Sequence, residues 1–256
     1  MSMNDGGVFV RDGERLDDLM TGGLKIIQSE DVFSFSLDAV LLARFAPVPA
    51  KGRIVDLCSG NGVIPLLLST RTSASITGVE IQRRPAEMAE RNVRLNGLQH
   101  RIRIEQADLR TFHITAGHGA FDLVTVNPPY LSAGSGDLTL NPRIAAARHE
   151  IYATLSDVAE ACARLVKSGG KVAMVHRPSR LADIMTEFRR VRLEPKRVRF
   201  VHPRADKEAN MVLIEAMKDG KPELRLMAPL IVHETDGSYT KEVADILYGK
   251  KRELNG

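Results

Sequence analysis

Residues 127–130, Asn-Pro-Pro-Tyr, end a run of β-forming residues in the segment FDLVTVNPPYLS. Two consecutive prolines cannot continue a central strand, because each lacks an N–H donor and restricts the residue before it. The chain therefore leaves the sheet at Asn127. The Asn127 side-chain oxygen and the Pro128 carbonyl can both accept hydrogen bonds from an amino group on a planar ring. Pro129 keeps these acceptors rigid, and Tyr130 offers a stacking face worth roughly 1–3 kcal/mol per base. The segment predicts a clamp for a planar amino group.

A glycine-rich turn follows an earlier β-forming run, in VDLCSGNG at residues 55–62. Gly60 and Gly62 let the backbone approach a ligand closely, although this pair alone fits nucleotides, phosphates and tight turns alike. Glu80 ends the next strand about twenty residues on, where a carboxylate can accept hydrogen bonds from both hydroxyls of a ribose. Asp108 follows the third strand, where its carboxylate or the neighbouring backbone could meet an adenine amino group. Together these residues predict a nucleoside-containing cofactor.

A dinucleotide cofactor is the rival interpretation of the same turn. The dinucleotide-binding motif usually has a third glycine, three residues after the second. Pro65 stands at that position in this chain, which disfavours NAD. Cys58 has no histidine near it in sequence, so we expect a small packed residue rather than a nucleophile.

Short apolar runs alternate with amphipathic ones from Arg53 onward, which predicts a parallel sheet covered by helices on both faces. Asn96-Gly97 and Gly169-Gly170 are expected to end two of the helices. Segments 196–203 and 209–217 are expected to pair as a hairpin at the edge of the sheet. The expected strands are 24–28, 53–58, 75–80, 101–106, 121–127, 171–176, 196–203, 209–217 and 224–233; the expected helices start at Ser36 and after residue 62, and cover 85–97, 152–170, 179–191 and 239–251.

Bulk composition narrows the class of protein. A chain of 256 residues with 43% hydrophobic content can bury a full core. Only two cysteines are available, Cys58 and Cys162, with no histidine cluster at ligand spacing, so we expect neither disulfides nor a metal site. The N-terminal residues lack a signal-peptide pattern, and no run reaches about 18 apolar residues. We therefore expect a cytoplasmic protein without a membrane segment.

The ordered motifs D-L-C-S-G-N-G, V-E-I at 79–81, A-D-L at 107–109 and N-P-P-Y resemble those of the Rossmann-like S-adenosylmethionine-dependent methyltransferases. The resemblance implies S-adenosylmethionine as cofactor and an α/β fold with a seven-stranded sheet, parallel except for one antiparallel strand of the edge hairpin. It also implies roles for individual residues. Glu80 would bind the ribose, Asp108 with Leu109 the adenine, and Asp56 would lie near the methionine moiety. The remaining implied cofactor contacts are Cys58, Gly60, Asn61, Gly62, Ile81 and Asn127.

Longer stretches resemble the bacterial tRNA valine adenine-N6-methyltransferase family. They are FSFSLDAVLLARF at 33–45, N-P-P-Y, ARHE at 147–150 and HPRADKEANMVLIEA at 202–216. The resemblance implies methylation of the exocyclic N6 of an adenosine just 3′ of the anticodon, at position 37, with Asn127, Pro128 and Tyr130 as catalytic residues. Phe35 would lie near the cofactor. Pro129, Tyr130 and Arg148 would contact the substrate in the anticodon loop.

A basic strip of seven residues supports a nucleic-acid partner. Alternation in KRVRFV places Arg197 and Arg199 on one face, which with Arg204 could run along phosphates and make binding salt-dependent. The alternative is a solvated edge strand protected by its charges. The strip consists of Arg189, Arg190, Arg192, Lys196, Arg197, Arg199 and Arg204.

Several functions remain open at this point. The N-P-P-Y clamp fits a glutamine amide of a protein or guanine N2 of ribosomal RNA as well as adenine N6. The chain could also be a non-catalytic RNA-binding protein that kept the fold. For the domains, we expect an N-terminal extension over 1–50 that covers the cofactor site, a methyltransferase core over 51–220, and a strand and helix over 221–256 appended to the core.

Overall fold

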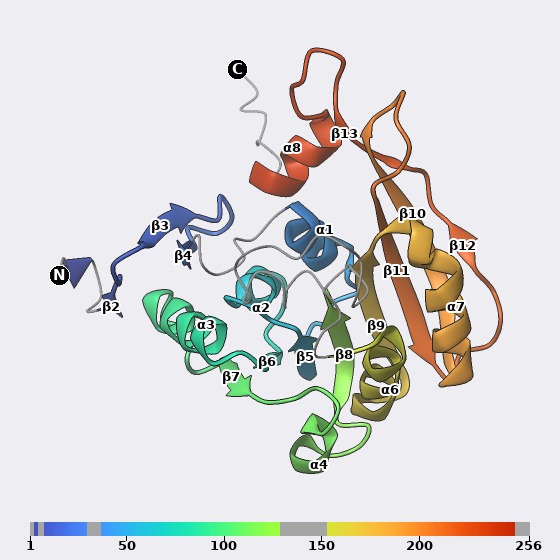
Figure 1. Cartoon of the computed structure of the whole chain (residues 1–256), viewed down its shortest axis with the longest axis horizontal. Helices are drawn as coiled ribbons and strands as arrows, with labels where there is room; N and C mark the ends of the chain where they lie inside the picture. Colours follow the sequence, from blue (N-terminus) through green and yellow to red (C-terminus); the bar gives the residue numbers. More distant parts are fainter. Residues whose placement is uncertain (1–2, 5–7, 30–36, 129–152, 249–256) are drawn as a thin grey trace.

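The computed structural model describes residues 3–4, 8–29, 37–128 and 153–248. Its centre is a mixed sheet of nine strands (Figure 1), in the order β12-β10-β11-β9-β8-β5-β6-β7, with β13 also paired to β10. The strands are β5 (Arg53–Leu57), β6 (Ser75–Glu80), β7 (Ile102–Gln106), β8 (Phe121–Val126), β9 (Val166–His176), β10 (Leu193–Arg204), β11 (Met211–Lys218), β12 (Arg225–Leu226) and β13 (Leu230–His233). The α/β fold is as expected, but the sheet has two strands more than the seven predicted.

The expected hairpin is confirmed, and it explains the two extra strands. Strand β11 pairs antiparallel with both β10 and β9, so it lies inside the sheet rather than at its edge. Strand β10 is therefore left with a free side, along which β12 and β13 add in parallel. The single late strand expected over residues 224–233 is in fact these two short strands.

Helices cover both faces of the sheet. Successive side chains of a strand point to opposite faces, so neighbouring residues pack against different helices. Ile54 packs with α1 (Leu37–Phe45) and α2 (Val63–Ser69) on one face. Val55, its neighbour, packs with α4 (Phe112–Ala116), α6 (Leu155–Leu165) and α7 (Leu181–Arg190) on the other. The first face also carries α3 (Arg83–Leu95) (Figure 1). A 3-10 turn, η1 (Pro178–Arg180), precedes α7, and α8 (Lys241–Tyr248) lies near α1.

One of the two expected helix ends is wrong. Helix α3 does end at this pair: its last residue is Leu95, Asn96 is its C-cap, and Gly97 follows with φ +66°. Helix α6, however, ends at Leu165, and β9 begins with the next residue. A Cβ at Gly170 would lie 2.8 Å from a Val166 methyl group and 3.1 Å from the Asp122 carbonyl oxygen. Gly170 is therefore needed for the close approach of β9 to β8, not for ending a helix.

The N-terminal part forms small separate hairpins. Strand β3 (Glu14–Asp18) pairs antiparallel with β4 (Lys25–Ser29), and β4 confirms the strand expected at 24–28. Strands β1 (Met3–Asn4) and β2 (Val8–Phe9) form a second pair. The β3–β4 hairpin packs against α3 (Figure 1).

Candidate active site

Four parallel strands bring the predicted chemical groups to one edge of the sheet. Leu57, the last residue of β5, pairs with Val79 of β6 and with Val126 of β8, and Glu80 pairs with Gln106 of β7. The chain runs from β5 outward to β7 and then returns to β8 on the other side of β5. This reversal of strand order is the position where open α/β sheets bind ligands.

The turn after β5, residues 58–62, is called the glycine loop below. Gly60 and Gly62 have φ of +55° and +84°, which a glycine adopts without strain. A Cβ at Gly62 would lie 3.1 Å from the Ala89 Cβ, so only glycine lets the loop meet α3 this closely. Cys58 has φ +57° although it is not glycine, a strained conformation that often occurs at functional sites. Burial raises the pKa of its thiol well above the ordinary value, which disfavours a thiolate nucleophile.

Glu80 holds the glycine loop from the neighbouring strand. Its side chain is buried, at 5% exposure, and accepts hydrogen bonds from the backbone N–H groups of Gly60 and Gln82, both at 2.9 Å. Burial raises the pKa of this carboxyl, and the two hydrogen bonds partly offset the rise. A carboxylate oxygen can accept more than one hydrogen bond, so Glu80 can hold the glycine loop and still meet a ligand hydroxyl. Ile81, the next residue, is half-buried.

Asp56 lies beneath the glycine loop and joins β5 to β8. It is fully buried, and its Oδ1 accepts a hydrogen bond from the Thr125 hydroxyl at 2.6 Å. Burial raises the pKa of Asp56 to about 7, with a smaller contribution from the charge of Glu80. The strand that carries the cofactor motif is thereby tied to the strand that ends at Asn127.

Unsatisfied polar groups gather at the same loop. Among the described residues, Asp56 Oδ2, the Ser59 hydroxyl and Asn61 Nδ2 are buried without a hydrogen-bond partner. Buried polar groups in proteins are nearly always paired, so such atoms indicate a bound water or ligand. The set offers both donors and acceptors, so a polar or charged group of a ligand could be held beside the loop.

Asp108 and Leu109 follow β7 at the same edge. The Asp108 carboxylate accepts hydrogen bonds from the Arg110 guanidinium and from the Arg110 backbone N–H, at 2.9 Å each, and these lower the pKa of Asp108. Leu109 is buried. The carboxylate is therefore occupied, and the backbone beside it is the freer group for an adenine.

Asn127 and Pro128 leave β8 as the prolines predict, with Asn127 half-buried and Pro128 buried. Pro129, Tyr130, Arg148 and Phe35 lie outside the described residues. Sequence reasoning overlooked His176, the last residue of β9. Since Val126 pairs with Met174 in parallel register, His176 lies at the level of Pro128.

His176 is fully buried, and its Nδ1 accepts a hydrogen bond from the Arg177 N–H at 2.8 Å. Burial lowers its pKa to about 4, with a further contribution from the charge of Arg180. The ring is therefore neutral at physiological pH. A polar residue at the end of a strand that neighbours N-P-P-Y is the signal that could have identified it.

The basic strip is engaged in contacts within the chain. Arg197 is paired with the buried Glu215, and its guanidinium lies 4.8 Å from the ring centre of Phe45. Arg199 forms a bidentate pair with Glu242, at 2.7 and 2.9 Å. Arg204 is more exposed and makes a single contact of 3.2 Å with Asp206. Arg197 and Arg199 do share a face, as expected, but this face is covered by protein groups, and a phosphate contact by either stays a prediction.

The other four cations of the strip also have partners. Three of them form ion pairs, and Lys196 donates to a backbone carbonyl. The pairs are Arg189–Glu194, Arg190–Glu187, Arg190–Glu160, Arg192–Asp219 and Lys196–Lys221 O.

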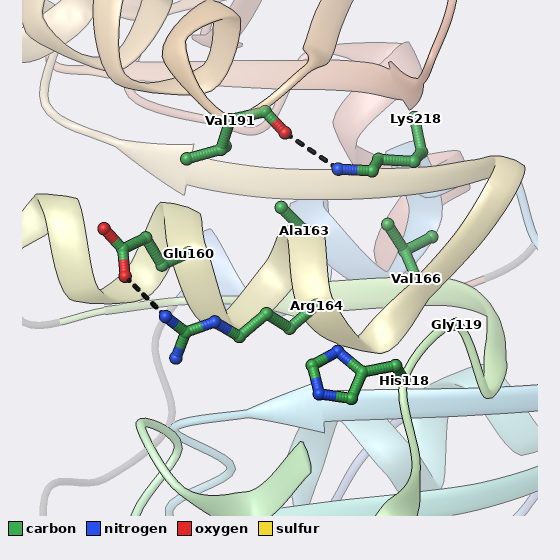
Figure 2. Close-up of a pocket in the computed structure, with 8 residues that line it drawn as sticks. All are labelled: His118, Gly119, Glu160, Ala163, Arg164, Val166, Val191 and Lys218. Atoms are coloured by element: carbon green, nitrogen blue, oxygen red, sulfur yellow. Dashed lines mark hydrogen bonds and ion pairs between the residues drawn. The ribbon is translucent and has the colours of Figure 1, made fainter.

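A hollow of about 420 Å³ lies at the opposite edge of the sheet (Figure 2). Gly119 precedes β8, Val166 starts β9, and Lys218 ends the antiparallel β11, so these residues surround the beginnings of the parallel strands. Lys218 donates a hydrogen bond to the Val191 carbonyl at 2.8 Å, and Arg164 to Glu160 at 3.0 Å. None of the predicted site residues lines this hollow, which is separate from the candidate active site. Its lining is His118, Gly119, Glu160, Ala163, Arg164, Val166, Val191 and Lys218.

In the described ranges 3–4, 8–29, 37–128 and 153–248, no group of three or more His, Cys, Asp or Glu side chains is arranged to hold a metal ion. No helix within these ranges combines the length and the apolar character that a membrane crossing requires.

Comparison with known proteins identifies the family. The model of the methyltransferase small domain matches residues 23–201. A protein of Aeromonas hydrophila subsp. hydrophila named tRNA1(Val) (adenine(37)-N6)-methyltransferase is 32% identical over 207 residues, which cover 79% of this chain and 84% of the relative. A protein of the same name from Tolumonas auensis is 32% identical over 236 residues, which cover 87% and 93% of the two chains.

Solved structures agree on the fold. A "predicted O-methyltransferase" of Agrobacterium tumefaciens matches with a TM-score of 0.67 and 28% identity, over 83% of this chain and 96% of that one. A geranyl diphosphate methyltransferase in complex with SAM matches with a TM-score of 0.52 and 16% identity, over 70% and 84% of the two chains. The chain belongs to the methyltransferase small domain family and, within it, to the family of the bacterial proteins named tRNA1(Val) (adenine(37)-N6)-methyltransferase.

Proposed function

We propose that this protein is an S-adenosylmethionine-dependent methyltransferase that acts on the exocyclic N6 of an adenosine in tRNA, at position 37 beside the anticodon. The observation that carries the proposal is the pairing of Leu57 with Val126. This register sets the glycine loop and the Asn127-Pro128 acceptors at adjacent strand ends, so a cofactor and a planar amine would meet there. The names of the relatives support the same reaction.

The cofactor contacts follow from the residues that close each strand. Glu80 would accept hydrogen bonds from the ribose hydroxyls, and the backbone at Asp108 and Leu109 would face the adenine. The glycine loop, with Asp56 beneath it, would hold the amino-acid end through its unsatisfied polar atoms. Bound S-adenosylmethionine supplies an electrophilic methyl group on a sulfonium.

The acceptor contacts lie at the end of β8. An exocyclic amine is a weak nucleophile because its lone pair is delocalised into the ring. The Asn127 side-chain oxygen and the Pro128 carbonyl would accept both N–H groups, fix the amine in line with the methyl group, and stabilise positive charge that develops on nitrogen. Tyr130 would stack on the base. His176, neutral and buried at the end of the neighbouring strand β9, would exclude water and charge from this side of the clamp.

Contacts with tRNA would involve the extracted base and basic side chains outside the clamp. A base in an anticodon loop must leave its stack to enter such a clamp, at a cost of a few kcal/mol, which is less than for a paired base. Arg148 belongs to the stretch that resembles the tRNA enzymes. Within the basic strip, Arg204 is the best phosphate contact because its one partner, Asp206, is itself exposed. Arg197 and Arg199 would need to leave the carboxylates they already contact.

A single incubation tests the proposed function. Purified protein is mixed with labelled S-adenosylmethionine and total tRNA from a strain that lacks the gene, and the digested RNA is examined by mass spectrometry. We expect label in N6-methyladenosine. The same tRNA from a strain that carries the gene should accept little label, because its sites are already methylated.

Three outcomes would contradict the proposal. Label in a guanosine or a ribose oxygen would replace the adenine assignment with another RNA substrate. No label in RNA despite measurable cofactor binding would direct the search to protein glutamine, and no cofactor binding at all would favour a non-catalytic RNA-binding protein.

A further inference from the structure

Asn92 in α3 and Asn96, the C-cap of this helix, lie about one helical turn apart, and both form hydrogen bonds with β4. The side-chain oxygen of Asn92 accepts a hydrogen bond from the Ile27 N–H at 2.6 Å, and its amide nitrogen donates to the Ile27 carbonyl at 3.1 Å. Asn96 makes the same two contacts with Lys25, at 2.9 and 2.7 Å. Each side-chain amide therefore pairs one residue of β4 in the way a neighbouring strand would.

The spacing explains why this arrangement fits. Four residues of helix rise about 6.0 Å, and two residues of strand advance about 6.8 Å. Asparagines at i and i+4 on a helix therefore reach alternate residues along a strand. The backbone N–H and C=O groups of Lys25 and Ile27 in β4 are thereby hydrogen-bonded by the two asparagine side chains. A bidentate ion pair between Arg91 and Glu14, at 2.6 Å for each bond, is a third contact that holds the hairpin on α3.

The two asparagines differ in their third contact. The Asn96 amide nitrogen donates to the Asn92 backbone carbonyl at 2.8 Å, within the end of α3 itself, whereas Asn92 reaches the glycine loop. The Asn92 amide nitrogen donates to the backbone carbonyl of Asn61 in this loop, at 2.9 Å. The Asn92 side chain is 0% exposed, and its oxygen and both of its N–H donors are used. One turn earlier, Ala89 lies against Gly62, so α3 meets the loop at two points.

The Asn61–Gly62 peptide group is followed by a glycine with φ +84°, a conformation that L side chains rarely adopt, so the orientation of this peptide group depends on the contacts that hold it. Two hydrogen bonds fix its orientation. The Gly62 N–H donates to the Ser59 carbonyl at 2.9 Å, and the Asn61 carbonyl accepts from Asn92.

We propose that Asn92 is a positioning residue for the cofactor, which fixes the Asn61–Gly62 peptide group of the glycine loop and couples it to the docked N-terminal hairpin. The inference rests on the proposed function, because it assigns the glycine loop to cofactor binding. Asn92 acts through the loop and is not expected to touch the cofactor. Asn96 anchors the same hairpin without contacting the loop and is therefore a matched control.

The test compares Asn92→Ala with Asn96→Ala in the full-length chain. Thermal unfolding measures the loss of hairpin docking, and isothermal titration with S-adenosylhomocysteine measures cofactor affinity. We expect both variants to unfold at lower temperature. Only Asn92→Ala should weaken the affinity, by about tenfold, which is the value of one buried hydrogen bond. Hydrogen exchange at the Gly62 amide should also accelerate in the Asn92 variant alone.

The outcomes separate this inference from the proposed function. If both variants bind S-adenosylhomocysteine as tightly as the wild type, the proposed role of Asn92 is overturned and the proposed function is left intact. An equal loss in both variants would assign the effect to hairpin docking and would also overturn the role of Asn92. Absence of binding by the wild type would instead refute the proposed function. If Asn92→Ala does not fold, Asn92→Asp keeps the acceptor for Ile27 but, when ionised, cannot donate to Asn61, and the same loss of affinity is expected.

Discussion

The glycine loop and strand β10 both carry polar groups that look functional in the sequence, yet the structure uses them in opposite ways. Around the loop, Asp56, Ser59 and Asn61 each keep a buried polar atom without a partner in the described part of the chain. Along β10, Arg197, Arg199 and Arg204 each have a carboxylate partner. The loop therefore has polar atoms that can still bind a ligand, whereas carboxylate partners already neutralise most of the positive charge on β10.

A count of charged residues is therefore weaker evidence of a binding surface than a buried polar atom without a hydrogen-bond partner. A paired arginine must break its contact before it can bind a phosphate, which removes much of the gain. A buried donor or acceptor without a partner costs free energy until something binds it. We expect the strand ends around the glycine loop to bind ligands, and the charged side chains of β10 mainly to stabilise the fold.

The largest effect is expected at the clamp. Replacing Asn127 by Ala removes one of the two acceptors for the amine, and should lower turnover by about a hundredfold to a thousandfold, as loss of one transition-state hydrogen bond does elsewhere. The affinity for the cofactor should fall far less than turnover, because Asn127 is only one of the implied cofactor contacts and Glu80 and the glycine loop are unchanged. Single-turnover kinetics and calorimetric titration measure the two quantities separately.

Asn127→Asp is the matched variant, because a carboxylate keeps the acceptor oxygens. It should retain more activity than Asn127→Ala. Loss of cofactor binding together with turnover in Asn127→Ala would contradict the assigned role.

The next effect is expected at Glu80. Replacing it by Ala removes the acceptor of the Gly60 and Gln82 N–H groups and the expected ribose contact. Cofactor affinity should fall by about tenfold to a hundredfold, because hydrogen bonds to a charged group are worth about 1.5–3 kcal/mol. Glu105→Ala on the adjacent strand removes a carboxylate that pairs with the exposed Arg103, and should leave the affinity unchanged. A similar loss in both variants would show that net charge, not the Glu80 contact, governs binding.

Periodicity and motifs predicted the elements that carry the site, because each strand end is marked by a distinct polar residue. Glu80 and Asn127 follow uninterrupted β-forming runs, and both lie at the predicted edge. The end of α6 was mispredicted, since Gly169-Gly170 is a helix-ending pattern locally, and only the approach of β9 to Asp122 shows why Gly170 is needed.

Contacts between distant segments were not predictable in this way. The pairing of Asn92 with Ile27 joins residues 65 positions apart, and an asparagine within an amphipathic helix gives no sign of it. The partners of Arg197 and Arg199, namely Glu215 and Glu242, come from elements whose position depends on the whole sheet. The local sequence pattern therefore predicts where strands end, whereas the partner of a charged side chain depends on the tertiary structure.

The third prediction concerns stability and pH. Asp56 has a pKa of about 7 when folded against 3.8 otherwise, so the folded state binds more protons in this window and stability falls as pH rises. His176 has a pKa of about 4 against 6.5, so the unfolded state binds more protons and stability rises with pH. Between pH 5 and 7 each group changes stability by about 2 kcal/mol, in opposite directions.

Single variants should reveal these opposed slopes. Asp56→Asn, which keeps an acceptor for Thr125, should become more stable from pH 5 to 7, and His176→Phe should become less stable over the same range. Urea unfolding at several pH values measures both. Parallel curves for the two variants would mean that neither group titrates as its burial predicts.

The smallest effect is expected at β10, where Arg199 and Arg204 can be compared directly. Arg199 is 15% exposed, donates to the Ala228 carbonyl at 3.0 Å, and pairs with Glu242, which is 52% exposed. Because solvent screens this pair, Arg199→Ala should cost about 1 kcal/mol of stability and leave the salt dependence of tRNA binding unchanged. Arg204→Ala should leave stability unchanged and lower the salt slope by about 1, as expected for one phosphate contact. Urea unfolding and filter binding across a salt series distinguish the two. If Arg199→Ala lowers the salt slope at constant stability, Arg199 binds phosphate after all, and its contact with Glu242 is one that tRNA displaces.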